Sequence, residues 1–163
     1  MEAENKKPMS SLLNKYGYFS DDGTEYVITR PDTPMPWINV LSNGDYGLAV
    51  SQAGGGYSWR THASLNRITR WEQDLIRDPW GKFLYIRDRD SGEFWSPTPL
   101  PAGKNLQEYQ VRHGQGYSVF SGRAAEVESR LTIFVPFGDP AEIWLLRLEN
   151  RGQSARRLRV FSY

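Results

Sequence analysis

Apolar and polar residues alternate along short stretches of this chain, and Gly and Pro separate those stretches. In the clearest stretch, Arg130–Val135, the apolar residues Leu131, Ile133 and Val135 fall on every second position, and Pro136 ends the run. An alternation of period two predicts a half-buried β-strand. Val, Ile, Tyr, Phe and Trp, which favour strands, dominate the other stretches. They predict strands at Glu25–Arg30, Ile38–Leu41, Tyr46–Ser51, Gly56–Trp59, Phe83–Asp88, Tyr109–His113 and Tyr117–Ser121.

Two pairs of stretches carry turn residues typical of β-hairpins. Phe83–Asp88 and Phe94-Trp95 flank Arg89-Asp90-Ser91-Gly92, which predicts the first hairpin. The second pair, Glu142–Leu148 and Leu158–Phe161, is joined through residues 149–153, where Asn and Gly tolerate positive φ.

The last of these strands predicts its own orientation. Arg157 and Arg159 are expected to face water, while Leu158 and Val160 face the core.

Many short strands with turn residues between them predict an all-β fold, an antiparallel sandwich. No stretch longer than about ten residues repeats its apolar positions at helical spacing. Ala63–Trp71 fits a helical turn or a strand, and we favour a strand. Residues 1–15 are predicted to be a flexible tail and residues 16–163 to be the N-terminal part of one β-sandwich domain. The chain stops inside the apolar run Val160–Tyr163, so we expect this sandwich to be incomplete and to continue in a longer protein.

Composition narrows the function classes. The 163 residues carry 20 Lys and Arg against 19 Asp and Glu, a net charge of +1. Nucleic-acid binding relies on a basic excess, so no nucleic-acid partner is expected. With no Cys and two His, the chain lacks the usual ligands for a metal site, and we expect neither metal nor cofactor. No apolar run approaches the ~20 residues of a membrane helix. The first ten residues lack a signal-peptide core, and we expect a cytoplasmic protein without membrane contact.

Three polar motifs of the sequence are candidates for a catalytic or binding role. Gly54-Gly55-Gly56 follows a strand, but the Lys and Ser/Thr of a P-loop and a following helix are missing. A tight turn or bulge that another segment approaches is favoured over a phosphate site. His113 has no Ser or Cys in an elbow-like setting, which favours a hydrogen-bonded structural histidine. Paired carboxylates serve glycoside hydrolysis, but solvated surface charge is favoured for the pairs Asp21/Asp22, Asp88/Asp90 and Glu126/Glu128.

The aromatic content is the strongest functional signal in the composition. Six Trp, nine Tyr and seven Phe exceed what a small sandwich core requires. Sugars stack their C–H faces on aromatic rings while polar neighbours orient them, so aromatic rings are typical of glycan sites. The alternative is that Trp37 and Trp144 belong to the core and the other rings cover an interface.

Ordered motifs across residues 16–163 resemble the N-terminal part of the cellobiose and chitobiose phosphorylase family. Their residues are 16–19 (YGYF), 25–34 (EYVITRPDTP), 36–39 (PWIN), 53–59 (AGGGYSW), 67–70 (RITR), 95–98 (WSPT), 112–117 (RHGQGY), 134–136 (FVP) and 142–144 (EIW). The amino-acid sequence of residues 51–59 is most similar to the cellobionic-acid phosphorylase and cyclic β-1,2-glucan synthase branches.

The resemblance implies an antiparallel super-β-sandwich similar to galactose mutarotase, followed by helical linkers and a catalytic α/α-barrel. It implies inverting phosphorolysis, in which an Asp acts as general acid and inorganic phosphate, the co-substrate, attacks the anomeric carbon. Because the family's catalytic and phosphate-binding residues lie in the barrel, no residue of this chain is expected to be catalytic. The barrel, a β-linked oligosaccharide bound by the full-length enzyme and a second copy in a homodimer are the implied partners.

We therefore expect the carbohydrate-binding-like sandwich of an enzyme that cleaves β-glucosides (cellobiose-like, cellobionic acid or β-1,2-glucan) to sugar 1-phosphate. The chain alone is expected to be inactive. A non-catalytic carbohydrate-binding or dimerisation module is the alternative. Loops on a rigid scaffold usually carry binding groups, and the substrate-binding candidates are Gln52, Tyr57, Trp59, Arg112 and His113. Tyr57 and Trp59 offer stacking faces, and the other three offer hydrogen bonds to hydroxyls or to an acceptor carboxylate, unless these loops only pack against the barrel.

Overall fold

The computed structural model describes residues 14–72, 74 and 77–163. The expected tail at residues 1–15 lies outside the described residues except for its last two positions. The strands of the described part are β1 (Gly17–Phe19), β2 (Glu25–Ile28), β3 (Ile38–Ser42), β4 (Tyr46–Ser51), β5 (Gly56–Arg60), β6 (Leu84–Asp88), β7 (Phe94–Trp95), β8 (Gln107–Gly114), β9 (Tyr117–Ala124), β10 (Val127–Phe134), β11 (Ile143–Asn150) and β12 (Leu158–Ser162).

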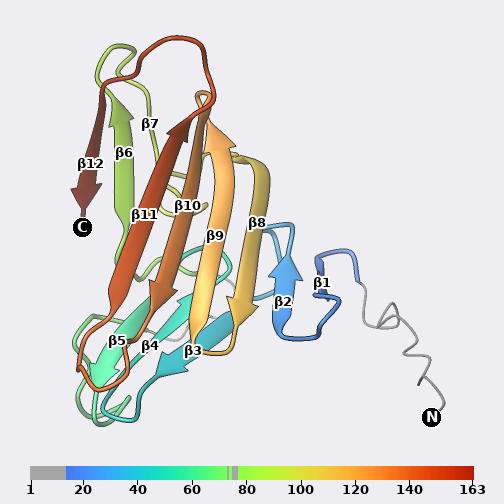
Figure 1. The fold of residues 1–163 in the computed structure, drawn as a ribbon. Helices are drawn as coiled ribbons and strands as arrows, with labels where there is room; N and C mark the ends of the chain where they lie inside the picture. Colours follow the sequence, from blue (N-terminus) through green and yellow to red (C-terminus); the bar gives the residue numbers. More distant parts are fainter. Residues whose placement is uncertain (1–13, 73, 75–76) are drawn as a thin grey trace, which may run out of the picture.

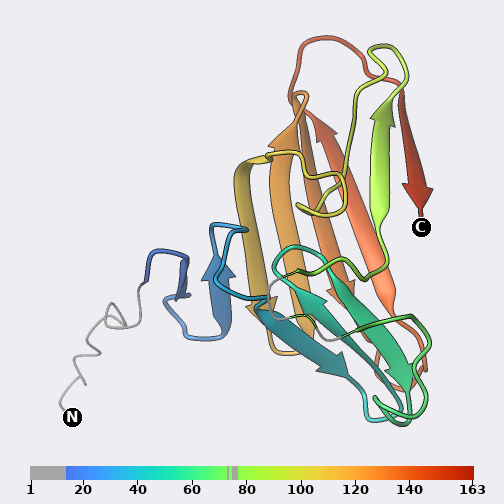
Figure 2. The ribbon, with the colours of Figure 1, turned by 180° about the vertical axis from the view of Figure 1, so that it is seen from behind.

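The strands form one large sheet and two small ones, all antiparallel. The large sheet has the order β1-β2-β8-β9-β10-β11, and the small sheets have the orders β3-β4-β5 and β12-β6-β7. The sheet β3-β4-β5 crosses one end of the large sheet, and β6 and β12 lie beside its other end (Figures 1 and 2). The predicted all-β antiparallel fold is confirmed. No helix in the described residues has the length and apolar character needed to span a bilayer.

Alternation along the strands decides which side chains reach the interior. In β10, Leu131 and Ile133 are fully buried, whereas Arg130, the residue before Leu131, is exposed. This pattern confirms the strand predicted around Arg130–Val135, which begins three residues earlier and ends one residue earlier than expected.

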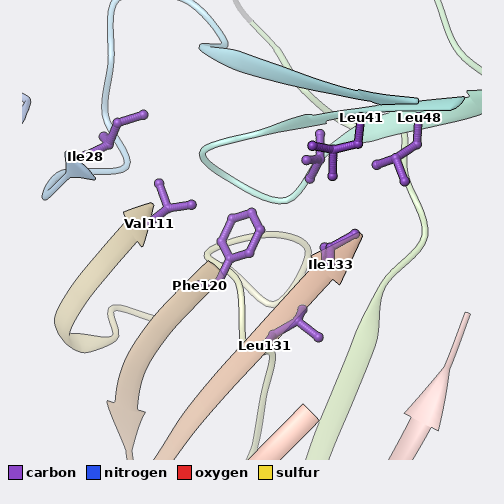
Figure 3. Packing of buried hydrophobic residues seen from close by; sticks show 8 residues of the cluster. Ile28, Leu41, Leu48, Val111, Phe120, Leu131 and Ile133 are labelled. Atoms are coloured by element: carbon purple, nitrogen blue, oxygen red, sulfur yellow. The ribbon is translucent and has the colours of Figure 1, made fainter. Parts of the chain in front are cut away.

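Two apolar clusters join the large sheet to the small sheets. In the first, Leu41 and Leu48 of the β3-β4-β5 sheet pack against Phe120, Leu131 and Ile133 of the large sheet (Figure 3).

In the second cluster, Ile86 of β6 and Trp95 of β7 pack against Ala124 and Val127 of the large sheet. Burial of these side chains supplies the main free energy that holds the three sheets together. Trp37 and Trp144 pack, partly buried, against the first cluster, as the core interpretation of these two rings expected.

One predicted hairpin is confirmed and the other is wrong. β6 pairs with β7 as expected, but β12 pairs with β6 rather than with β11. Arg156 donates to the buried Asp88 carboxylate at 2.8 Å, and Leu158 packs on the second cluster. These contacts hold the last strand beside β6, so the chain crosses from one sheet to another after β11.

The expected orientation of β12 is confirmed only in part. Arg157 and Arg159 are exposed and Leu158 is partly buried. Val160 is 48% exposed, although it lies on the same face of β12 as Leu158. The expectation for Val160 was therefore wrong, because no strand of the described residues covers this end of β12.

Ala63–Trp71 does not form the predicted strand. It contains turns and bends, and a single bridge joins Trp59 to Arg67. The Nδ1 atom of His62 accepts the backbone N–H groups of Ser64 and Leu65, both at 3.2 Å, and so curls the chain. Side-chain bonds of this kind compete with a strand ladder.

The turn between β4 and β5 is hydrogen-bonded to three other segments of the chain. The Gly56 N–H donates to the Trp80 carbonyl at 2.6 Å, and the Leu100 N–H donates to the Ala53 carbonyl at 3.0 Å. The Gln52 N–H donates to the Trp37 carbonyl at 3.0 Å. The predicted tight turn that another segment approaches is confirmed, and its amide groups are bonded within the protein instead of forming a phosphate cradle.

Gly56 is the most constrained position of this turn. Its φ is +148°, and a Cβ atom at Gly56 would lie 1.9 Å from the Ala49 carbonyl oxygen. Gly92 also has a positive φ, +76°, but a Cβ atom there meets nothing within 4 Å.

We therefore expect Gly56→Ala to lower the free energy of unfolding by more than about 3 kcal/mol, because it adds a backbone clash to the conformational cost. Gly92→Ala is the matched control and should cost about 1 kcal/mol. Chemical unfolding followed by tryptophan fluorescence measures both. Equal losses in the two variants would contradict this account of the turn.

Candidate functional site

The five predicted substrate-binding residues lie on two sheets. Gln52, Tyr57 and Trp59 belong to the β4–β5 hairpin, and Arg112 and His113 are neighbours on β8. The structure brings Tyr57 and Trp59 together, with ring centroids 5.2 Å apart. Successive strand residues point to opposite faces, so Arg112 and His113 are separated by the thickness of the large sheet. Whether any of the five contacts a substrate stays a prediction.

Gln52 is a buried structural link. It is 4% exposed, its Oε1 accepts the Trp37 N–H at 2.8 Å, and its Nε2 donates to the Pro31 carbonyl at 3.0 Å. Its backbone carbonyl accepts the Tyr109 hydroxyl at 2.5 Å, and burial raises the pKa of that hydroxyl. Both ends of the Gln52 amide are therefore used in holding the segment around Pro31 and Trp37.

Tyr57 is the centre of an aromatic group. Trp71 stacks on it with centroids 4.9 Å apart and planes 28° apart, and Trp59 is tilted against it. The Arg67 guanidinium lies 5.5 Å from the Tyr57 centroid and 5.4 Å from the Trp71 centroid. Because these distances are nearly equal, Arg67 lies beside the stacked pair rather than on the outer face of either ring.

Arg112 is paired on the outer face of the large sheet. Its Nη1 donates to Glu25 Oε2 at 2.6 Å, and its Nε donates to Gln110 Oε1 at 3.0 Å. The Tyr117 hydroxyl donates to Glu25 Oε1 at 2.7 Å. The bond from Tyr117, followed by that from Arg112, lowers the pKa of Glu25, so this carboxylate stays ionised beside Arg112.

His113 lies on the inner face. Its Nδ1 shares a 2.9 Å hydrogen bond with Ser118 Oγ, which also accepts the Asn39 Nδ2 group at 3.1 Å. Burial lowers the pKa of His113 to about 4. Ser118 is completely buried, so this Ser–His pair cannot meet a substrate, and the structural interpretation of His113 is supported.

The carboxylate pairs serve the fold. Asp22 and Glu128 are bonded to nearby surface groups, as expected of solvated charge. Asp88 was wrongly expected at the surface, because it is 1% exposed. It accepts the Asp90 N–H at 2.8 Å and the Arg156 guanidinium, and the backbone bond is the first of the causes that lower its pKa.

A half-buried ion pair that the alternation pattern could not show links the segment before β6 to the segment before β11, where Glu142 also bonds to the β3-β4-β5 sheet. Glu142 pairs with Lys82 and accepts Ser58 Oγ at 2.7 Å, Trp144 Nε1 at 3.1 Å and the Tyr46 hydroxyl at 3.2 Å. Desolvation lowers the pKa of Lys82. With these four donors around it, Glu142 has no free oxygen to offer as a general acid or base.

Two cavities meet beside the β4–β5 turn. The larger, about 940 Å³, is lined by segments 29–36, 52–53, 77–79 and 99–109. The smaller, about 240 Å³, is lined by Tyr57, Trp71 and Trp80 together with Met35 and neighbouring residues. Both cavities share Met35, Pro36 and the segment 77–79.

Asp78 lies in the wall between the two cavities. It accepts the hydroxyl of Ser51, and burial raises its pKa. A Cβ atom at Gly55 would clash with the Asp78 carboxylate, which explains a glycine at this position. Sequence reasoning missed Asp78 because it lies outside the predicted strands and beside no motif of known chemistry.

The described residues do not form a metal-binding site. Within the described residues, no group of three or more His, Cys, Asp or Glu side chains is arranged to hold a metal ion. The two cavities beside the β4–β5 turn and the aromatic rings next to them are features that a ligand could contact.

Comparisons with known proteins agree with this architecture. The family profile described as "Glycosyl hydrolase 94, supersandwich domain" matches residues 24–163. The chain is 42% identical over 151 residues to the N,N'-diacetylchitobiose phosphorylase of Vibrio proteolyticus, covering 91% of this chain and 19% of that protein. It is 33% identical over 151 residues to the solabiose phosphorylase of Paenibacillus borealis, covering 91% and 20%.

A third relative is named for a different activity. The chain is 34% identical over 153 residues to the cyclic beta-(1,2)-glucan synthase NdvB of Rhizobium meliloti, covering 92% of this chain and 5% of that protein. The chain thus spans about a fifth or less of the length of each relative.

The partly buried His113 predicts a pH dependence of stability. The His113 imidazole binds a proton near pH 6.5 in the unfolded chain, but only near pH 4 in the folded chain. The free energy of unfolding should therefore fall by up to about 3 kcal/mol between these values as the pH is lowered. In His113→Gln this part of the slope should vanish, and urea unfolding at a series of pH values measures it.

The exposed His62 provides the control. His62→Gln should keep the slope of the wild-type chain. A slope that survives in His113→Gln would show that other groups carry the pH dependence.

Proposed function

The chain belongs to glycosyl hydrolase family 94 as its supersandwich domain, and we propose that it is the N-terminal domain of an inverting β-glycoside phosphorylase. The observation that supports this proposal is the match of residues 24–163 together with relatives that are named phosphorylases. The resemblance inferred from the sequence motifs is thereby confirmed at the level of the family.

The proposed reaction divides the work between domains. A β-linked glucoside is cleaved by attack of inorganic phosphate on the anomeric carbon, and a carboxylic acid protonates the leaving oxygen, which gives sugar 1-phosphate and a free acceptor sugar. Phosphate is itself the nucleophile, so no separate base is required. In the described residues, the carboxylates of Glu25, Asp88 and Glu142 are held by donors of the fold. The family resemblance implies that the acid belongs to an α/α-barrel outside this chain, and the pairing of these three carboxylates within the fold supports that assignment.

The role we assign to this domain is support and positioning. It packs against the barrel, contributes to a homodimer and places loops at the rim of the acceptor site. Arg112 is the best placed of the predicted residues for an acceptor contact, because its side chain is about one third exposed and has an ionised partner. A guanidinium in this setting is suited to hydroxyls or to a carboxylate of the acceptor.

The first test concerns activity. The purified 163-residue chain should release no sugar 1-phosphate from cellobiose, N,N'-diacetylchitobiose or a β-1,2-glucan in the presence of phosphate, because the catalytic acid is proposed to lie in the barrel. The longer protein that carries this segment should release it from at least one of them. Turnover by the rigorously purified chain, or none by the longer protein with any β-linked substrate, would contradict the proposal.

The second test concerns Arg112 and is made on the longer protein. In the synthetic direction, Arg112→Ala should raise the acceptor KM by about tenfold, since one charge-assisted contact is lost. The matched control is Glu25→Gln, which breaks the same ion pair but keeps the guanidinium. Its KM should remain near that of the wild type. If both variants melt at lower temperature and keep the wild-type KM, Arg112 is structural.

A further inference from the structure

The smaller cavity lies on the outer face of the β3-β4-β5 sheet. Leu48 and Val50 point into the first apolar cluster, so Ala49 between them faces outward. Tyr57 pairs with Ala49 across the sheet and shares that face. Ile38, on the edge of the same cavity, is 58% exposed. This face of the sheet is turned away from the large sheet (Figure 2).

Two tryptophans close the cavity and are held in place by the fold. The backbone of Trp80 is held through its carbonyl, which accepts the Gly56 N–H, and the Arg70 guanidinium lies over its ring, 6.0 Å from the centroid. Trp71 stacks on Tyr57, and Arg67 lies beside this pair. The outer face of the Trp71 ring is consequently not covered by either neighbour. Rings that are already fixed lose little conformational entropy when a ligand stacks on them.

Polar groups of both signs line the same cavity. Asp78 is held in the wall by Ser51, and the exposed Arg77 precedes it. Glu72 is a further exposed lining residue. A carboxylate and a guanidinium together accept and donate hydrogen bonds to hydroxyl groups. The mixture of signs gives no excess of positive charge for a phosphate.

Size and chemistry together indicate one sugar ring. The volume of about 240 Å³ is below the roughly 300 Å³ at which pockets for drug-sized ligands begin. Aromatic walls suit the C–H faces of a pyranose, and a few polar groups at the rim suit its hydroxyls. An apolar side chain of a partner would offer no hydrogen-bonding groups to the Asp78 and Arg77 side chains that line the cavity.

We propose that the cavity formed by Tyr57, Trp71 and Trp80 binds one neutral pyranose unit of a β-linked oligosaccharide. Asp78 and Arg77 hydrogen-bond the hydroxyls of that unit. Adjoining units extend into the larger cavity, which shares the wall formed by segment 77–79. The choice of a β-linked sugar rests on the proposed function, whereas the site itself rests on the geometry of this chain.

The test is fluorine NMR of the chain labelled with fluorotryptophan, with resonances assigned from single Trp→Phe variants. Cellobiose and N,N'-diacetylchitobiose are the probes, and maltose, which is α-linked, is the control sugar. At least one probe should shift the Trp71 and Trp80 resonances saturably. The Trp95 resonance should not move, because Trp95 is fully buried in the second cluster.

Variants locate the binding. Trp71→Ala, followed through Trp80, should weaken binding by about tenfold, the loss expected for one aromatic contact. Trp71→Phe should retain most of the affinity. Phe94→Ala removes an exposed ring of β7 away from the cavity and should leave binding unchanged.

Two results would overturn the proposal: no shift in a chain whose dispersed Trp95 resonance shows that it is folded, or equal affinity of Trp71→Ala and wild type. If the chain does not fold alone, the same resonances in the longer protein decide the question. Phosphate is omitted, so the measurement is independent of turnover. A longer protein that cleaves its substrate while Trp71 and Trp80 remain unaffected would refute this site and leave the proposed function intact.

Discussion

The turn between β4 and β5 is the constraint on which the rest of the structure depends. Backbone groups of residues 52–56 bond to Trp37, Trp80 and Leu100, which belong to segments far apart along the chain. A glycine is required at Gly56 because a Cβ atom there would meet the Ala49 carbonyl. The turn therefore determines where the β5–β6 connection passes and where both cavities form. The segments that its hydrogen bonds align include the walls of the candidate sugar site.

Several charged groups of the types that serve in catalysis are paired within the fold. Glu142, which pairs with Lys82, also bonds to the β3-β4-β5 sheet, and Asp88 with Arg156 holds the segment just before β12. Buried carboxylates of this kind are stable only when donors surround them, and a carboxylate so surrounded has no oxygen for a substrate. These candidate acid–base residues therefore serve as structural contacts between segments. This is consistent with a domain that supports a catalytic neighbour.

Two groups of aromatic residues have different surroundings. Trp37, Trp95 and Trp144 pack against the two apolar clusters, where they supply buried area between sheets. Tyr57, Trp71 and Trp80 gather on the outer face of the β3-β4-β5 sheet around a cavity. Burial explains the first population completely, because core packing requires only shape and area. The second population leaves ring faces beside polar groups, and a ligand with both apolar and hydroxyl surfaces would explain it.

The sequence by itself determined the all-β class, the family and most strands, because period-two alternation and ordered motifs are local properties of the chain. It also predicted the glycine turn, because three consecutive glycines are typical of a tight turn or bulge rather than of the interior of a strand. Tertiary structure alone decided that β12 pairs with β6, because that choice depends on Leu158 reaching the second cluster. It likewise placed Asp78 between two cavities. Such positions arise where distant segments meet, and no local pattern records which segments meet.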